Sequence, residues 1–235
     1  MRLDQYLVEN SFVESRNISQ TLIKNGDVEV DGVVIKKPSF KITNQLVEVK
    51  NQNIYVSRAA NKLKGFFQNI DNFDIKGFEV LDIGASTGGF TQIVLEYGVD
   101  SVTSLDVGDN QLHEKLVNDN RVEVVQNQDI RTFFPNKKYD LITCDVSFIS
   151  IEYILDDINR LAEDKIIILF KPQFEVGKSV KRDRKGVIVD DLAIIQAQQK
   201  FEQITKKLDW QLTKKEKSIL KGKEGNIEYF YYFKK

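Results

Sequence analysis

Near the middle of the chain, residues 81–91 read LDIGASTGGFT, an apolar segment that runs into a turn with three glycines. Glycines at a strand-to-helix turn let a ligand approach the backbone closely, and they leave helix amide groups pointing at it. The turn therefore predicts a binding site for a small ligand. Its expected contacts are Gly84, Ala85, Ser86, Thr87, Gly88, Gly89 and Phe90.

Three aspartates at the ends of successive predicted strands narrow the choice of ligand. Asp106 lies where the ribose of a bound adenosine would be held, which suits nicotinamide cofactors and S-adenosylmethionine alike. Asp82 precedes the first glycine, where a carboxylate accepts from an ammonium group but repels a pyrophosphate. The spacing G-x-x-x-G-G also differs from the dinucleotide fingerprint. Both details favour S-adenosylmethionine, and Asp129 either contacts its adenine or caps a helix.

Four further charged residues are candidates for chemistry on a substrate. Asp145 follows the fourth strand predicted beyond residue 57, Lys171 ends the fifth, and Glu228 begins the last. If that last strand is antiparallel, it begins at the sheet edge where open α/β sheets bind ligands. Lys62, from the helix before the first strand, completes the cluster. Taken singly, each residue could instead be a surface charge or a helix cap.

Alternating strands and helices would position these residues. Strands are predicted at 78–83, 101–107, 122–126, 139–144 and 165–170, and helices near 59–70, 90–97, 110–118, 150–162 and 191–208. This alternation predicts an α/β fold, a parallel sheet with helices on both faces. Two final strands, at 210–218 and 227–233, flank a glycine-containing hairpin. Such an ending favours a class I (Rossmann-like) methyltransferase, with a mostly parallel seven-stranded sheet, over a dehydrogenase.

The first fifty or so residues predict a smaller α+β module of two short helices, a hairpin at Asp31-Gly32 and one more strand. The segments that carry its resemblance are RLD at 2–4, SR at 15–16, IKNGDV at 23–28, VDG at 30–32 and KKP at 36–38. They resemble the RNA-binding module named after ribosomal small-subunit protein four. The resemblance implies that one helical face presents basic and polar residues to RNA, namely Arg2, Arg16, Gln20 and Lys24. Solvated helix charges are the alternative.

Motifs along nearly the whole chain resemble the TlyA-type hemolysin A family. They are YVSRAANKL at 55–63, the glycine turn, DVSFIS at 145–150, KPQFEVGK at 171–178 and GNIEYF at 225–230. The resemblance implies a ribosomal RNA 2′-O-methyltransferase with an FtsJ-like catalytic domain, and a cytidine of large-subunit (23S) rRNA as its target. It also maps the family's Lys-Asp-Lys-Glu tetrad onto Lys62, Asp145, Lys171 and Glu228. The predicted division is an RNA-binding domain with its linker at 1–56 and a methyltransferase domain at 57–235.

The tetrad suits the chemistry that the resemblance implies. A ribose 2′-hydroxyl must lose its proton as it attacks a sulfonium methyl group, and a lysine can accept that proton only when it is neutral. A nearby ammonium group and partial burial lower the pKa of a lysine, so Lys62 is expected to act on Lys171. The two carboxylates would position the amines and the hydroxyl, and no metal is required.

Basic residues near the predicted site are candidates for RNA phosphate contacts. Arg58 precedes the helix of Lys62, and a basic run follows Lys171. In that run the candidates are Lys178, Lys181, Arg182 and Arg184. Solvated loop charge is the alternative, and a steep fall of binding with added salt would distinguish the two.

Composition limits the other function classes. The chain has 235 residues, 35 acidic and 34 basic ones, one cysteine and one histidine, which disfavours a disulfide scaffold and a zinc or iron–sulfur site. With no signal peptide and no bilayer-spanning apolar run, we expect a cytoplasmic protein without a membrane span. Three alternatives stay open: a base methyltransferase, a non-catalytic RNA-binding protein and a membrane-active hemolysin. For the first, Phe148 is near Asp145, but no aromatic clamp is evident.

Overall fold

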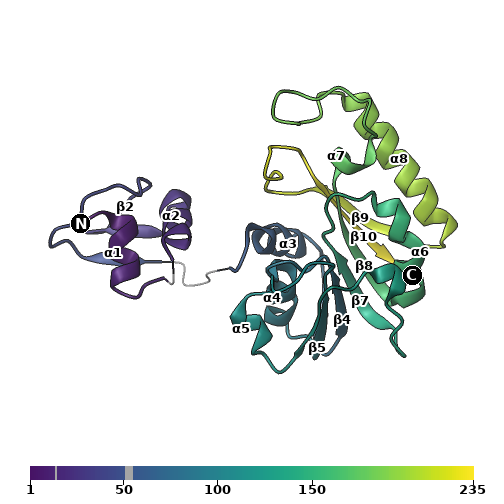
Figure 1. Cartoon of the computed structure of the whole chain (residues 1–235), viewed down its shortest axis with the longest axis horizontal. Helices are drawn as coiled ribbons and strands as arrows, with labels where there is room; N and C mark the ends of the chain where they lie inside the picture. The colour runs from purple at the N-terminus through teal and green to yellow at the C-terminus, as the bar shows by residue number, and fades with distance from the viewer. Residues whose placement is uncertain (14, 51–54) are drawn as a thin grey trace. The chain divides into compact units, whose positions relative to one another are not determined.

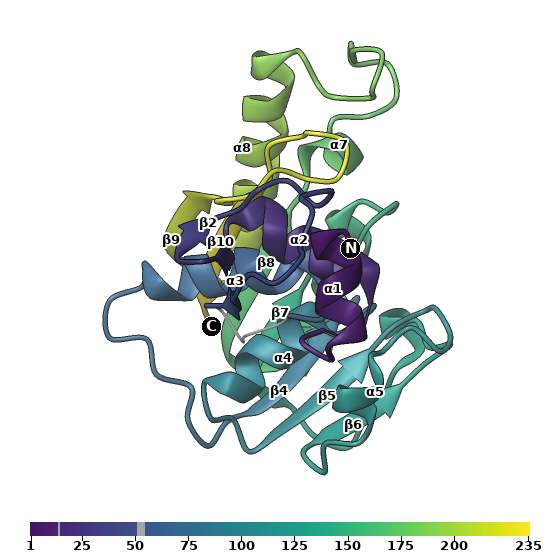
Figure 2. The same cartoon turned by 90° about the vertical axis from the view of Figure 1, so that its left-hand side faces the viewer.

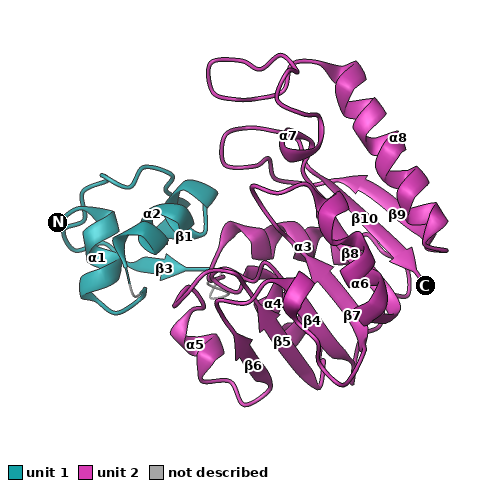
Figure 3. Cartoon of the chain, turned by 45° about the vertical axis from the view of Figure 1, so that its right-hand side comes forward, with its two compact units in different colours: residues 1–54 teal, residues 55–235 magenta. Residues whose placement is uncertain are grey.

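The computed structural model describes residues 1–13, 15–50 and 55–235. Its contacts divide the chain into two compact units, residues 1–54 and residues 55–235 (Figures 1 and 3). Residues 51–54 of the predicted linker lie outside the described residues. Each unit has a hydrophobic core of its own.

The smaller unit contains two helices and a three-stranded antiparallel sheet in the order β2-β1-β3. Its elements are α1 (Leu3–Glu9), α2 (Arg16–Asn25), β1 (Val28–Val30), β2 (Val33–Val34) and β3 (Val47–Val49). The hydroxyl of Ser15 accepts a hydrogen bond from the amide of Ile18 and so caps α2. The predicted order of helix, helix, hairpin and strand is confirmed.

The larger unit alternates strands and helices before it ends in two strands. Its elements are α3 (Arg58–Gln68), β4 (Glu79–Ile83), α4 (Gly89–Glu96), β5 (Ser101–Leu105), α5 (Glu114–Val117), β6 (Val122–Val125), η1 (Ile130–Thr132), β7 (Tyr139–Cys144), η2 (Ile151–Ile154), α6 (Leu155–Leu161), β8 (Ala162–Phe170), α7 (Pro172–Glu175), α8 (Asp191–Lys207), β9 (Gln211–Lys217) and β10 (Tyr229–Lys234).

These strands form one seven-stranded sheet in the order β6-β5-β4-β7-β8-β10-β9. The first five are parallel, whereas β10 pairs antiparallel with both β8 and β9. Because Tyr229 at the start of β10 lies opposite Phe170 at the end of β8, Glu228 falls at the carboxyl edge of the parallel strands. The predicted class I methyltransferase fold is confirmed.

Helices cover both faces of the sheet, and the strands are apolar toward both (Figure 3). On β8, Ile166, Ile168 and Phe170 pack with α6 and α8, while Ile167 and Leu169 pack with the side of α3 and α4. A strand buried on both sides reads as a continuous apolar run, which is why β8 is so evident in the sequence.

Two predicted helices differ in the structure. The helix expected at 110–118 is wrong in its first half, because Asn110 has a φ of 50°, outside the right-handed helical region, and α5 begins only at Glu114. The helix expected at 150–162 is a 3₁₀ turn followed by α6, and the chain then enters β8 directly at Ala162.

Candidate active site

The glycine turn between β4 and α4 packs directly against the loop that follows β7. Gly84 has a φ of 76°, and a Cβ at this position would lie 3.1 Å from the backbone carbonyl group of Asp145. A side chain would therefore be strained and would also push the two loops apart. Because Gly84 has no side chain, the turn can lie directly against the backbone of Asp145.

Two cavities meet at this turn, and Gly84, Ser86, Asp145 and Ser147 line both. The first has a volume of about 330 Å³ and extends toward α3 and Lys171. The second has a volume of about 380 Å³ and extends over the carboxyl ends of β4 and β5. Of the predicted turn contacts, Ala85, Thr87, Gly89 and Phe90 line the first cavity; Gly88 is placed at the start of α4 and lines neither.

Asp106 is held at the wall of the second cavity. One of its carboxylate oxygens accepts from the amide of Ser86 and the other from the amide of Gly108, both at 2.7 Å. Apolar groups, including Val107 and Ile149, line the same cavity. An acid beside an apolar wall suits a sugar joined to a flat base, so the residues present fit an adenosine group.

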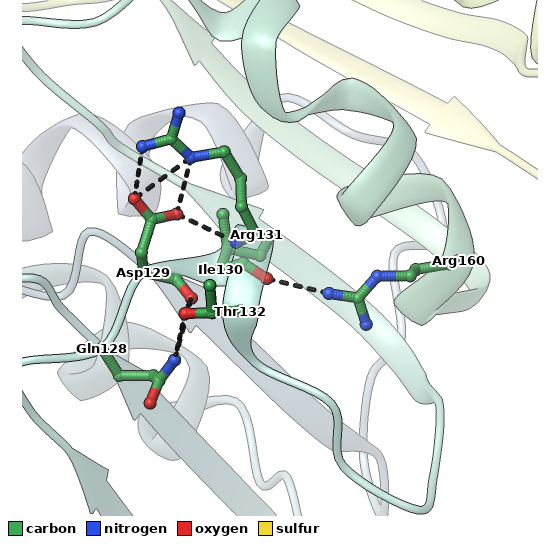
Figure 4. A network of polar contacts seen from close by, with 6 residues as sticks. All are labelled: Gln128, Asp129, Ile130, Arg131, Thr132 and Arg160. Atoms are coloured by element: carbon green, nitrogen blue, oxygen red, sulfur yellow. Dashed lines mark hydrogen bonds and ion pairs between the residues drawn. The ribbon is translucent and has the colours of Figure 1, made fainter.

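Asp129 also lines the second cavity, but its carboxylate is engaged locally (Figure 4). It accepts from the amide of Arg131, which caps η1, and it forms an ion pair with the Arg131 guanidinium at 2.6 Å. These hydrogen bonds lower the pKa of Asp129. The capping role is therefore present, and contact with an adenine amino group stays a prediction.

Asp82 lies away from both cavities, contrary to its expected contact with an ammonium group. Its side chain is fully buried and accepts from the hydroxyls of Thr91 at 2.7 Å and Thr143 at 2.8 Å. Burial raises the pKa of this carboxyl to about 6. Asp82 thus joins β4 to α4 and β7 beneath the turn, and the two threonines were the signal for this role that the sequence reading missed.

The four charged residues of the tetrad form two ion pairs. Lys171 Nζ lies 2.6 Å from Asp145 Oδ1, and Lys62 Nζ lies 2.6 Å from Glu228 Oε2. Lys62, Lys171 and Glu228 are each less than 10% exposed, and Lys62, Asp145 and Lys171 line the first cavity with Gly84. Amines and carboxylates from four distant segments therefore meet beside the glycine turn.

Two polar residues that the sequence reading did not select complete these pairs. The hydroxyl of Ser147 accepts from Lys171 Nζ at 2.8 Å, and Gln173 Nε2 donates to Glu228 Oε1 at 3.1 Å. Ser147 follows Asp145 by two residues and Gln173 follows Lys171 by two, so both belong to motifs already singled out. Each lysine of the tetrad is held by a carboxylate, and each pair has one further polar partner.

Two acids at this edge of the sheet have pKa values raised by burial, Asp145 and Glu175. Burial raises the pKa of Asp145, although the Lys171 ammonium group opposes the shift. The nearby Glu175 is placed alike: burial raises its pKa, while it accepts from the Ser150 hydroxyl and the Ile151 amide. Glu175, the last residue of α7, thereby ties that helix to the end of the segment that follows β7 and carries Asp145.

In the smaller unit, three of the four candidate RNA contacts converge on one acid. Arg2, Arg16 and Gln20 all donate to the carboxylate of Asp4, whose side chain is fully buried. The two guanidinium groups stay about half exposed, at 44% and 50%, and Lys24 is exposed on α2. Asp4 thus aligns two arginines on one face, where their outer edges are accessible.

The basic residues of the larger unit fall into two groups. Lys178, Lys181 and Arg184 are exposed on the loop between α7 and α8. Arg182, in contrast, donates to four backbone carbonyls, those of Lys178, Val180, Gln173 and Gly177, so it shapes the loop. Arg58 lines the first cavity and donates to the carbonyl of Lys221 at 3.0 Å.

Comparison with known families agrees with this architecture. Residues 55–235 match the model of the FtsJ-like methyltransferases, and residues 1–45 match that of the S4 domain. The fold and site define a class I methyltransferase joined to an S4 domain.

Relatives over the full length narrow the class. The chain is 46% identical to the 23S rRNA (cytidine-2′-O)-methyltransferase TlyA of Campylobacter jejuni, covering 99% of each. It is 34% identical to the 16S/23S rRNA (cytidine-2′-O)-methyltransferase TlyA of Mycobacterium tuberculosis, covering 99% of this chain and 89% of that one. A putative hemolysin from Streptococcus thermophilus superposes with a TM-score of 0.74 at 28% identity, covering 100% and 88%. The chain belongs to the TlyA-type hemolysin A family of FtsJ-like methyltransferases.

Several relatives carry the name hemolysin, which makes membrane insertion a relevant question. Across residues 1–13, 15–50 and 55–235, no helix combines the length and the apolar character needed to cross a bilayer.

Proposed function

We propose that this protein transfers the methyl group of S-adenosylmethionine to the ribose 2′-hydroxyl of a cytidine in 23S rRNA. The observation that carries the proposal is the pair of buried ion pairs, Lys171–Asp145 and Lys62–Glu228, beside the glycine turn. The identity to the TlyA methyltransferase of C. jejuni supports the nucleotide and the subunit.

The cavities suit the two reactants of this reaction. When bound, S-adenosylmethionine supplies an already activated methyl group on a sulfonium centre. Gly84 and Ser86 would hold its central part, and Asp106 would accept from its ribose. The first cavity, which reaches Lys171, would hold the RNA ribose.

Within this arrangement the Lys171 amine, after losing its own proton, takes the proton of the attacking hydroxyl as the hydroxyl oxygen bonds to the methyl carbon and the methyl–sulfur bond breaks. This amine is fixed by Asp145 and by Ser147, which orient it toward the cavity. Lys62, fixed by Glu228 and through it by Gln173, adds positive charge beside the developing alkoxide. The donor is activated in advance, so positioning and proton removal are the protein's share of the catalysis.

Nucleoside mass spectrometry of ribosomal RNA, from cells with and without the gene, tests the proposal. We expect one ribose-methylated cytidine in 23S rRNA to be absent when the protein is absent, and to return with the wild-type gene. Loss of a base-methylated nucleotide would identify a base methyltransferase instead. An unchanged profile would support the non-catalytic RNA-binding protein or the membrane-active hemolysin. A ribosomal RNA substrate also implies a cytoplasmic protein, in keeping with the sequence-based expectation.

A further inference from the structure

The first cavity carries more positive charge than its acids balance. Four basic side chains line it, namely Arg58, Lys62, Lys171 and Lys223. Lys62 and Lys171 are neutralised by Glu228 and Asp145 at 2.6 Å. Among the ion pairs of the described residues, none includes Arg58 or Lys223. Two uncompensated cations therefore stand at one side of the cavity.

Lys223 is placed at the cavity by the loop that joins β9 to β10. Gly222, its neighbour, packs so closely on Glu228 that a Cβ there would lie 2.5 Å from Oε1. The amide of Gly222 donates to the carbonyl of Asn226 at 2.8 Å, which closes the loop. A loop pressed against Glu228 cannot carry its lysine far from the reaction site.

Two further contacts fix the same loop. Arg58 donates to the carbonyl of Lys221, so the loop is tied to the start of α3. Asn226, which is 6% exposed, accepts from the amide of Ile188 and donates to the carbonyl of Gly186. Figures 1 and 2 show the loop between β9 and β10 beside the loop between α7 and α8, near α7. Lys223 is exposed, and the loop that carries it is held by contacts of Lys221, Gly222 and Asn226.

The chemistry of the substrate explains such a pair of cations. A ribose with a reacting 2′-hydroxyl carries a phosphodiester on the adjacent C3′, so an anion must lie next to the reacting oxygen. A guanidinium offers five donors in a planar fork that matches phosphate oxygens, and an ammonium group adds a point charge. Arg58 uses one nitrogen on Lys221, and its other donors are available.

We propose that Arg58 and Lys223 form the binding site for the phosphodiester that adjoins the target ribose. The inference rests on the proposed function, since it names the RNA group that the catalytic cavity receives. It assigns to the hairpin loop a role in seating the substrate. The carboxylate of the cofactor's methionine part is also an anion, so the experiment separates it from the phosphodiester.

Lys223→Gln tests the assignment in the full-length protein. Transfer of a labelled methyl group to 23S rRNA is measured at several salt concentrations, and S-adenosylmethionine affinity by calorimetry. We expect KM for RNA to rise about tenfold with kcat within about twofold of wild type. The slope of log(kcat/KM) against log[salt] should become shallower by about one, the signature of one lost phosphate contact. Cofactor affinity should stay within about twofold.

Two matched variants complete the design. Lys223→Arg keeps the positive charge, so KM and the salt slope should be close to those of wild type. A lysine that acted only through packing would not be replaced by arginine in this way. Lys76→Gln removes an exposed lysine before β4, at the opposite sheet edge, and should change neither quantity. The inference would be overturned if Lys223→Gln and Lys76→Gln had equal KM for RNA and equal salt slopes. It would also be overturned if Lys223→Gln lost affinity for S-adenosylmethionine while its KM for RNA was unchanged. A wild-type protein that methylates no ribose would instead overturn the proposed function.

Discussion

Asp4 in the smaller unit and Asp145 at the candidate active site are both shielded aspartates beside basic side chains, but their pKa values shift in opposite directions. Hydrogen bonds from Arg2, followed by those from Arg16 and Gln20, hold the pKa of Asp4 well below its usual range. Burial raises the pKa of Asp145 in spite of Lys171. Two aspartates of one chain therefore have pKa values shifted to opposite sides of the usual range.

The number of donors explains the difference. Asp4 accepts four hydrogen bonds from three side chains, so its negative charge is fully compensated within the fold. Asp145 has one cation, Lys171, and faces a cavity. A carboxylate that accepts several hydrogen bonds from neighbouring side chains holds a fold together, whereas one with a single ion-pair partner beside a cavity keeps the capacity to act on a substrate.

The largest expected effect concerns the less compensated site. Lys171→Ala should lower the rate of methyl transfer by about 10³-fold, since a positioned proton acceptor contributes on the order of 10²–10⁴-fold. S-adenosylmethionine affinity should stay within about threefold, because Lys171 lines the first cavity, which we propose receives the RNA ribose. Single-turnover transfer of a labelled methyl group, with calorimetry for the cofactor, measures both. Retained activity would remove Lys171 from the mechanism.

The fully compensated acid should matter for stability instead. Asp4→Ala removes the one carboxylate to which both arginines donate. We expect the free energy of unfolding of the smaller unit to fall by on the order of 3 kcal/mol. Hydrogen exchange on the full chain should show protection in α1 and α2 falling about 100-fold, with β4 and β7 unchanged. Glu48→Ala, at an exposed acid of β3, is the matched control. Undiminished protection would show that Asp4 is dispensable.

Asp82 extends the comparison to an acid without any basic partner. Its pKa is raised to about 6, so protonation stabilises the folded state at low pH, and this contribution disappears as the pH rises through 6. The free energy of unfolding of Asp82→Asn, taken relative to that of wild type, should therefore be about 1.4 kcal/mol higher at pH 7.5 than at pH 5, by the proton linkage relation. Urea unfolding at both pH values measures the difference. The exposed Asp100→Asn should show no such change, and an equal change in both variants would contradict the role of burial.

The smallest effects should come from exposed loop cations. The double variant Lys181→Gln, Arg184→Gln should raise KM for RNA by only about threefold and reduce the salt slope by up to about two. Arg182→Gln should differ from it, because loss of four carbonyl contacts loosens the loop as well. Limited proteolysis within residues 177–190 reports that loosening. Equal cleavage of both variants would show that Arg182 has no structural role.

Much of the fold was accessible from the sequence because its signals are local. The doubly buried β8 is a continuous apolar run, and the order of strands and helices followed from such runs. The helix expected from residue 110 was wrong because its pattern says nothing of the positive φ at Asn110. Backbone departures of that kind are set by tertiary packing.

The candidate site was predictable in its members but not in its contacts. Motif positions at strand ends singled out Asp145, Lys171 and Glu228, and the motif on the preceding helix added Lys62. Which amine meets which acid depends on side-chain placement between segments up to 166 residues apart, and no spacing rule encodes it. The same limit applies to Asp82 and Arg182, whose partners lie within the protein, and to Gln173, whose motif was noted but whose hydrogen bond to Glu228 was not predicted.

The placement of β10 has a consequence for synthesis. The last strand of the chain lies between β8 and β9, so it is inserted into the sheet and not appended to its margin. Translation proceeds from the amino terminus, so β8 has one unpaired side until residues 229–234 emerge, and Glu228 reaches Lys62 only then. A fragment of this protein that stops before Glu228 therefore lacks the partner of Lys62 and leaves β8 and β9 without the strand that joins them.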